Sequence, residues 1–262
     1  MQELITVPTI VEGLNRLGVN PGMTLLTHCS LSSFGHVQGG APTIIEALVE
    51  TVGEAGTIVM PTVTDGRFDP SEWSNPPVAA ELWDRIRFET PLYDPQKTPV
   101  DHTMSIVYEL FRRWPGAART AHPHSSLAAW GRHRDEILMV HKLEERFGES
   151  SPLARLYDLN GYVLFLGTTY ATNTCFHLAE YRRPEPPRRE FKIVREINGK
   201  RVLHEYSDVD TDSSVFQEIG DVFETEMHIA QGTIGCAECR LFPIREAVDF
   251  ALAWLVKTPA GC

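Results

Sequence analysis

His177 and Glu180 are the two side chains whose types and spacing best suit proton transfer. They follow an apolar run, residues 161–167, and a short polar loop, and they lie in a segment predicted to be a helix. Residues three apart share one face of a helix. Thr172 and Asn173 are favourable N-cap residues, which would place His177 within the first turn and a half. A histidine there with a carboxylate beside it can act as a general base, although the same pair is also typical of a structural hydrogen bond.

A second candidate is a loop of small hydroxyl residues and glycines that follows a predicted strand at residues 23–28. Such a loop leaves backbone N–H groups free, and the N-terminus of the next helix adds partial positive charge, so it can bind a phosphate. It matches neither the P-loop nor the GxGxxG pattern, and an ordinary strand-to-helix connection is the competing interpretation. The loop comprises Ser30, Leu31, Ser32, Ser33, Phe34, Gly35, His36 and Val37.

Residues 119–126 are also rich in hydrogen-bond donors and include His122 and His124. Two histidines at i, i+2 in a proline-containing loop lack a nearby third ligand, which favours a structural or anion-binding loop over a metal site. Cys236 and Cys239 form a lone CxxC motif without a second pair at zinc-site spacing. We therefore expect no metal.

Carboxylates alternate along the chain at Asp208, Asp210 and Asp212. Alternation on a strand puts such side chains on one face, where they can bind a cation or orient a base. A solvated turn that caps a helix is the other interpretation. Asp65 and Asp69 are open to the same two interpretations. The chain has no GxSxG motif and no nucleophilic-cysteine signature, so covalent acyl transfer through Ser or Cys is not supported.

The elements that must position these residues follow from composition and periodicity. The chain has 262 residues, 42% of them apolar, and we interpret residues 1–262 as a single domain. Strands alternate with helices in the first half and a hairpin follows, which predicts an α/β fold with a mixed central sheet. The expected helices lie at 10–17, 42–52, 101–113, 213–228 and 243–257, with a further short helix that starts at Ser151-Pro152. The expected strands lie at 23–28 and 57–60 and in the apolar run 161–167, and the hairpin strands at 191–197 and 200–206 around Asn198-Gly199.

Charge and the chain ends exclude several classes of function. The net charge of −11 argues against non-specific binding to nucleic acid or to an anionic membrane. It is compatible with a cationic small substrate and equally with simple solubility. The N-terminus lacks the pattern of a signal peptide, no long apolar run is present, and the five cysteines are scattered, so we expect a cytoplasmic protein with reduced thiols.

Several short motifs occur together in one order along nearly the whole chain. They are Thr27-His28-Cys29-Ser30-Leu31-Ser32-Ser33-Phe34-Gly35, Gly56-Thr57-Ile58-Val59-Met60-Pro61, Phe68-Asp69-Pro70, Tyr93-Asp94-Pro95, Arg119-Thr120-Ala121-His122-Pro123, Ser151-Pro152-Leu153 and Asn173-Thr174 with His177-Leu178-Ala179-Glu180. In this order they resemble the aminoglycoside 3-N-acetyltransferase family, also called the antibiotic N-acetyltransferase family. The pattern departs from the family at Cys29 and Thr120, where serine is usual, but both residues are small donors.

The resemblance implies acetyl transfer from acetyl-coenzyme A to the 3-amino group of a 2-deoxystreptamine aminoglycoside. It implies that His177 is the catalytic histidine. A carboxylate of Glu180, Asp208 or Asp210 can orient its ring, and the Thr174 hydroxyl can stabilise an oxyanion. The implied coenzyme contacts are Ser30, Leu31, Ser32, Ser33, Phe34, Gly35, Val37, Thr120, His122 and Ser126, and the implied substrate contacts are Asp65, Asp69, Asn173, Asp208 and Asp210.

Two other functions compete with this one. An enzyme of the same fold can acetylate an amine that is not an aminoglycoside, and a coenzyme-A-binding protein can lack turnover. The presence of His177 argues against the second of these. The sequence leaves the accepted amine open, and both a monomer and a homodimer are compatible with it.

Overall fold

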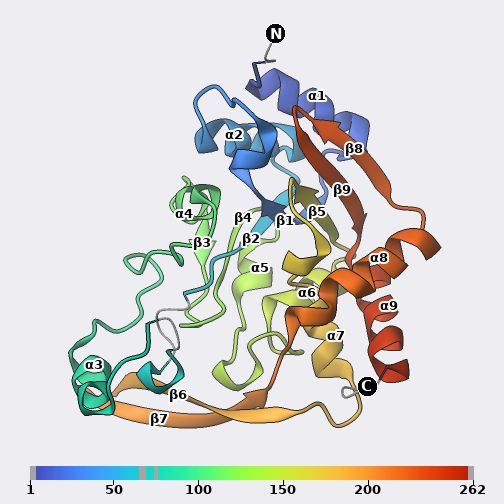
Figure 1. The fold of residues 1–262 in the computed structure, drawn as a ribbon. Coiled ribbons are helices and arrows are strands. Elements are labelled where there is room, and N and C mark those ends of the chain that lie inside the picture. Colours follow the sequence, from blue (N-terminus) through green and yellow to red (C-terminus); the bar gives the residue numbers. More distant parts are fainter. Residues whose placement is uncertain (1–3, 65–68, 74–75, 259–262) are drawn as a thin grey trace.

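The structure, a computed structural model, describes residues 4–64, 69–73 and 76–258 around a mixed sheet of seven strands (Figure 1). Its middle strands run parallel: β2 (Thr57–Pro61), β1 (Thr24–Cys29) and β5 (Tyr162–Leu166). Antiparallel strands extend it on both sides, so that the full order is β3 (Ala118–Arg119), β4 (Leu127–Gly131), β2, β1, β5, β9 (Ala237–Pro243) and β8 (Ala230–Ile234). The predicted mixed α/β sheet is confirmed.

Helices cover both faces of this sheet because its central strands are buried on both sides. In β1, Leu25 and Cys29 pack into one hydrophobic core and Leu26 into another. The first core also contains residues of α1 (Val7–Leu17), α2 (Ala41–Val52) and α4 (Ile106–Phe111). The second contains residues of α5 (Arg134–Leu138), α6 (Pro152–Asp158), α7 (Phe176–Arg182), α8 (Phe216–Glu226) and α9 (Ile244–Lys257). The carboxyl ends of the parallel strands therefore lie between two layers of helices.

A separate two-stranded sheet lies along the lower edge of the molecule in Figure 1 and consists of β6 (Arg188–Ile197) and β7 (Lys200–Val209). Its turn has φ angles of 51° at Asn198 and 74° at Gly199, as a type I′ turn requires. Phe191, Ile193 and Tyr206 form its small core. The predicted hairpin is confirmed, and both strands extend further than expected at the end away from the turn.

Several elements differ from the sequence-based expectations. The stretch 62–100, for which no helix or strand was expected, contains α3 (Trp83–Glu89) and the short 3-10 helices η3 (Pro70–Glu72) and η4 (Ala80–Leu82). The helix expected from Asp101 begins only at Ile106, because Ser105 caps it while the Asp101 carboxylate accepts the Thr103 N–H in a separate turn. Strands β3, β4 and β8 and helix α5 were not predicted. No helix in the described part of the chain is long and apolar enough to cross a membrane.

Candidate active site

His177 and Glu180 form the hydrogen-bonded pair that the spacing predicts. His177 is the second residue of α7, and its Nδ1 lies 2.6 Å from Glu180 Oε2. The other carboxylate oxygen accepts the backbone N–H of Asp212 at 2.6 Å, and Glu180 is buried. With Glu180 ionised, Nδ1 carries the proton and donates it, which leaves the lone pair of Nε2 as an acceptor. This is the tautomer that a general base needs.

Two aromatic rings hold the imidazole of His177 in place. Phe147 stacks on it with ring centroids 4.5 Å apart, and Phe216 contacts it at 4.8 Å. The side chain of His177 keeps 17% of its surface exposed. The ring is therefore fixed in orientation while part of it remains open to a substrate.

The start of α7 differs from the prediction. Thr172 belongs to the 3-10 helix η6 (Tyr170–Thr172), and the N-cap of α7 is Cys175, without a side-chain hydrogen bond. The Asn173 side chain is fully buried instead of reaching the free N–H groups, and its amide atoms have no hydrogen-bond partner among the described residues. The predicted N-cap is thus wrong, whereas the position of His177 in the first turn is confirmed.

A cavity of about 650 Å³ opens at the carboxyl ends of the parallel strands. This is where open α/β sheets usually bind ligands. The residues that line it combine hydroxyl and apolar groups, and they include no Asp, Glu, Lys or Arg. They are His28, Cys29, Ser30, Leu31, Ser32, Pro61, Val63, Thr103, Met104, Ser105, Ile106, Tyr108, Thr168, Thr172 and Thr174.

The structure thus brings the beginning of the predicted coenzyme loop together with Thr174. Residues Leu31–Phe34 form the 3-10 helix η1, and the Ser33 hydroxyl donates to the Gly167 carbonyl. Phe34 and Val37 point into the core, so that only their backbone is available to a ligand. Gly35 has a φ of 90°, a left-handed conformation that glycine adopts readily.

His28 is a site residue that sequence reasoning missed. It is buried at the end of β1, lines the cavity and has no hydrogen-bond partner for Nε2 among the described residues. Burial, and then the charge of His177, lower its pKa to about 3, so it is neutral at physiological pH. Its position directly before the serine loop was the available signal.

Thr120, His122 and Ser126 lie away from this cavity and are already engaged. The Thr120 hydroxyl accepts the Leu127 N–H, and Nδ1 of His122 accepts the N–H groups of His124 and Ser125. The Ser126 hydroxyl donates to the Thr62 carbonyl. His122 lines a different cavity, of about 440 Å³, next to the hairpin. The structure therefore does not bring these three side chains together with the Ser30 loop.

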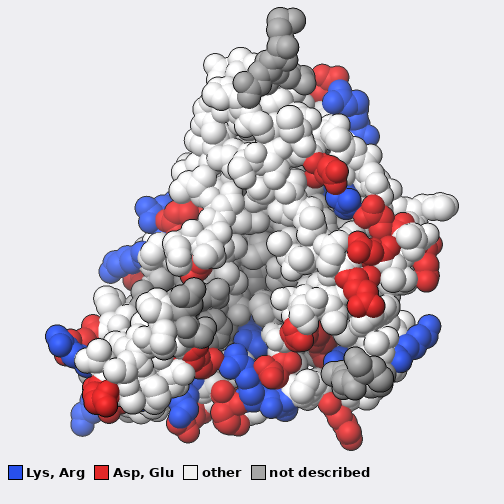
Figure 2. Space-filling view, viewed as in Figure 1, with Lys and Arg blue, Asp and Glu red and all other residues white. Residues whose placement is uncertain are grey.

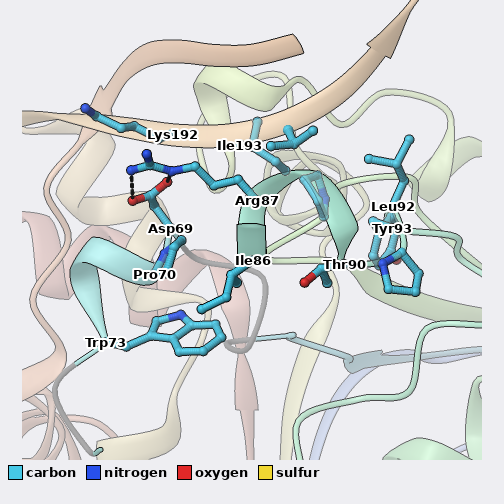
Figure 3. A pocket seen from close by; sticks show the side chains of 13 residues that line it. Asp69, Pro70, Trp73, Ile86, Arg87, Thr90, Leu92, Tyr93, Lys192 and Ile193 are labelled. Atoms are coloured by element: carbon cyan, nitrogen blue, oxygen red, sulfur yellow. Dashed lines mark hydrogen bonds and ion pairs between the residues drawn. The ribbon is translucent and has the colours of Figure 1, made fainter. Parts of the chain in front are cut away.

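The predicted substrate carboxylates within the described residues are paired with arginines. Asp69 accepts two hydrogen bonds from Arg87, at 2.7 and 2.8 Å, in a small pocket between η3, α3 and β6 (Figure 3). Burial opposes ionisation of Asp69, but the hydrogen bonds from Arg87 and Ser71 outweigh it and lower its pKa. Asp65 lies outside the described residues.

Asp208 and Asp210 are likewise paired, and neither is the partner of His177. Asp208 is fully buried beside Arg146, with 3.6 Å between its Oδ2 and Nε, and Asp210 lies 3.0 Å from Arg189 Nε. Asp212, not a predicted site residue, makes the backbone contact to Glu180 and caps the next turn through Ser214. In the described part of the chain no three metal-ligating side chains converge.

Because several histidines are buried, we expect the free energy of unfolding to depend strongly on pH. Burial lowers the pKa of His28 to about 3, that of His141 to about 4 and that of His122 well below 6.5. The unfolded chain takes up a proton at each near pH 6.5, whereas the folded protein does not. The free energy of unfolding should therefore fall as the pH drops below 6.5, by up to about 1.4 kcal/mol per pH unit for each histidine.

Urea titrations at about pH 7.5 and pH 5.5 test this expectation. His141→Gln, which removes one of the three groups, should make the decrease shallower. A free energy of unfolding that stays constant between these pH values would show that the histidines are not held neutral by the fold.

Known proteins resemble this chain in sequence and in fold. The family model described as Aminoglycoside 3-N-acetyltransferase matches residues 26–256. The SPbeta prophage-derived aminoglycoside N(3')-acetyltransferase-like protein YokD of Bacillus subtilis is 47% identical over 96% of this chain and 93% of its own, and its crystal structure superposes with a TM-score of 0.95 over 98% of this chain and 95% of that one. Aminoglycoside N(3)-acetyltransferase VII of Streptomyces paromomycinus is 34% identical over 96% and 91%. The binary complex of AAC-IIIb with CoASH, 27% identical, superposes over 99% and 100% with a TM-score of 0.87.

Proposed function

The chain belongs to the aminoglycoside 3-N-acetyltransferase family, a family of acyltransferases, and on this premise we propose that it acetylates the 3-amino group of an aminoglycoside. Acetyl-coenzyme A is the proposed acetyl donor. His177 is the proposed general base. The observation that carries the proposal is the pair of His177 and the buried Glu180, which leaves Nε2 of the imidazole free to accept a proton.

The proposed reaction is a direct transfer. Nε2 of His177 takes a proton from the substrate amine, and the amine nitrogen forms a bond to the thioester carbonyl carbon. As the carbon–sulfur bond breaks, the leaving thiolate takes up the second proton that the nitrogen loses in forming the amide, and the imidazolium of His177 afterwards releases its proton to solvent. Glu180 stabilises the imidazolium in the meantime. The Thr174 hydroxyl, at the edge of the cavity, is the proposed donor to the carbonyl oxygen as it becomes negative.

The cavity fits the uncharged part of coenzyme A. Its lining offers hydroxyl groups together with Leu31, Met104 and Ile106, which suits the amide and methylene groups of a pantetheine arm. Ser30 and Ser32 also line the cavity, and their backbone and hydroxyl groups suit charged phosphates better than its apolar residues do. We therefore assign the pantetheine arm to the cavity and the pyrophosphate to the serine loop.

The cysteines near the site support direct transfer over an acetyl-cysteine intermediate. Cys29 lines the cavity, and burial raises the pKa of its thiol. Burial also raises the pKa of the Cys175 thiol just before α7. A thiol held in its protonated form is a poor nucleophile.

An assay that follows free coenzyme A thiol tests the proposal. We expect thiol release from acetyl-coenzyme A with gentamicin-like aminoglycosides, none without an amine, and a product acetylated on the 3-amino group by NMR. Thiol release only with other amines would support acetyl transfer but refute an aminoglycoside as the acceptor. Coenzyme binding without thiol release for any amine would refute the enzyme function, and a covalent acetyl-protein formed on the pathway would refute direct transfer.

A further inference from the structure

The cavity assigned to the pantetheine arm lies where two neighbouring strands part. Strand β1 pairs with β5 as far as Cys29, whereas its pairing with β2 ends at Leu26. The Ser30 N–H donates to the Leu166 carbonyl of β5. Because successive N–H groups of a strand point to opposite sides, the Cys29 N–H points towards β2, beyond the last pair of these two strands. It therefore needs an acceptor from outside the sheet.

Tyr108 of α4 supplies this acceptor. Its hydroxyl oxygen accepts the Cys29 N–H at 2.8 Å, and its buried ring belongs to the first hydrophobic core, which holds the side chain in place. Burial, and then the neighbouring Cys29 thiol, raise the pKa of Tyr108, so the hydroxyl keeps its proton at neutral pH. The bond from Cys29 occupies one lone pair of the oxygen and leaves the O–H free to donate. Among the described residues this O–H has no acceptor.

This unused donor belongs to the wall of the cavity. Tyr108 and Cys29 both line it, together with hydroxyl and apolar side chains. The space-filling view in Figure 2 shows a hollow in the middle of this face, with charged side chains gathered at its lower edge and mainly uncharged residues above. A buried O–H without an acceptor forgoes a hydrogen bond that a bound molecule can restore. In uncharged surroundings the fitting partner is a neutral acceptor, such as the amide carbonyls of a pantetheine arm.

We propose that Tyr108 is a coenzyme-binding residue whose hydroxyl donates a hydrogen bond to an amide carbonyl of the pantetheine arm. The inference rests on the proposed use of acetyl-coenzyme A and adds a residue of α4 to the coenzyme contacts that the sequence implies. Since the amides of the arm take no part in the transfer, this bond stabilises the bound coenzyme equally before and during the reaction. It should therefore lower the KM for acetyl-coenzyme A without changing kcat.

The test compares Tyr108→Phe with a matched variant, Tyr206→Phe. Tyr206 is also a buried tyrosine whose hydroxyl has a hydrogen-bond partner, His124, but it lies in the hairpin and does not line this cavity. Titration calorimetry measures the affinity for two ligands. One is coenzyme A, and the other is adenosine 3′-phosphate 5′-diphosphate, the nucleotide half of the coenzyme without the arm.

For Tyr108→Phe we expect coenzyme A to bind roughly three- to ten-fold more weakly and the nucleotide to bind as it does to the wild type. The KM for acetyl-coenzyme A should rise by a similar factor. Tyr206→Phe should bind both ligands like the wild type. A purely structural Tyr108 would disturb the serine loop that follows Cys29 and weaken both ligands equally. That result, or an unchanged affinity for coenzyme A, would overturn the proposal.

A measurement on the wild type decides the question if Tyr108→Phe does not fold. His28-Cys29 is the only His-Cys pair in the sequence, so ¹³C-carbonyl histidine combined with ¹⁵N-cysteine gives one backbone NMR signal, that of Cys29. Hydrogen bonds in a chain strengthen one another, so coenzyme A should shorten the bond from Cys29 to Tyr108 and move the amide proton downfield. The nucleotide should leave it in place. No shift with coenzyme A, or the same shift with both ligands, would contradict the proposal.

These outcomes differ from failure of the proposed function. If no amine releases thiol but Tyr108→Phe still loses affinity for coenzyme A alone, acetyl transfer is refuted and Tyr108 remains a coenzyme contact. If aminoglycosides release thiol and Tyr108→Phe binds coenzyme A like the wild type, acetyl transfer stands and the role of Tyr108 is refuted.

Discussion

Replacing His177 by alanine is expected to lower kcat by about 10²- to 10⁴-fold, the range in which a positioned general base contributes. The substrate amine is protonated in water and cannot attack a thioester until a base has removed its proton. His177 is the histidine with a buried carboxylate on Nδ1 and a partly exposed ring. The KM for acetyl-coenzyme A should change little, because His177 does not line the cavity assigned to the pantetheine arm.

Steady-state thiol release measures this loss, and the chain offers a matched control. His133, the N-cap residue of α5, makes the same i, i+3 contact with a carboxylate, 2.9 Å from Glu136. His133→Ala should leave kcat unchanged. Because alanine also removes a ring packed against Phe147 and Phe216, the circular dichroism and melting temperature of His177→Ala must be recorded alongside. A folded His177→Ala with wild-type kcat would exclude His177 as the base.

The two histidine–glutamate pairs show what spacing alone predicts. Both pairs have the same separation along the chain, so spacing does not distinguish them. The Glu180 side chain is 7% exposed, whereas that of Glu136 is 52% exposed, and only the first helix follows a central parallel strand. The expected pairing of His177 with Glu180 on a helix after a strand is confirmed, because the apolar run before the pair indicated that strand, whereas the catalytic role of His177 stays a prediction.

Predictions failed where the deciding partner is distant in the sequence. Alternation left open whether Asp208 and Asp210 lie on a strand or in a turn, and it did not indicate their arginine partners, which are Arg146, 62 residues earlier, and Arg189, on the opposite strand. No local pattern reports such pairs. The same holds for Asn173, a favourable capping residue by type, which packing buries in the core before α7.

Segments without strong periodicity were the least predictable part of the fold. Helix α3 has only seven residues, none of them buried, so it shows no apolar stripe in the sequence. The hairpin, by contrast, was predictable because Asn198-Gly199 specifies a type I′ turn by itself. Local chemistry therefore predicted this turn better than it predicted helix caps or long-range contacts.

Asp208→Ala is expected to destabilise the protein by about 3–5 kcal/mol, the cost of leaving a buried charge without its partner. Asp208 is fully buried, and its carboxylate accepts the backbone N–H groups of Val209 and Arg146. The Arg146 side chain, also buried, bonds to the Val209 carbonyl and the Thr211 hydroxyl. Removing Asp208 leaves this buried guanidinium without its carboxylate partner. Urea unfolding at neutral pH measures the resulting decrease in the free energy of unfolding.

Stability and turnover together decide between a structural and a catalytic Asp208. The resemblance to the family implies a role at the substrate, whereas the Arg146 pair indicates a support for Phe147, the residue next to Arg146, whose ring stacks on His177. If the pair is structural, Asp208→Ala assayed well below its melting temperature should keep kcat within about ten-fold of the wild type. Asp210→Ala removes an exposed ion pair and should change the free energy of unfolding by less than about 1 kcal/mol. A stable Asp208→Ala that has lost turnover would instead place Asp208 in the chemistry, since only a role at the reacting groups would separate activity from folding.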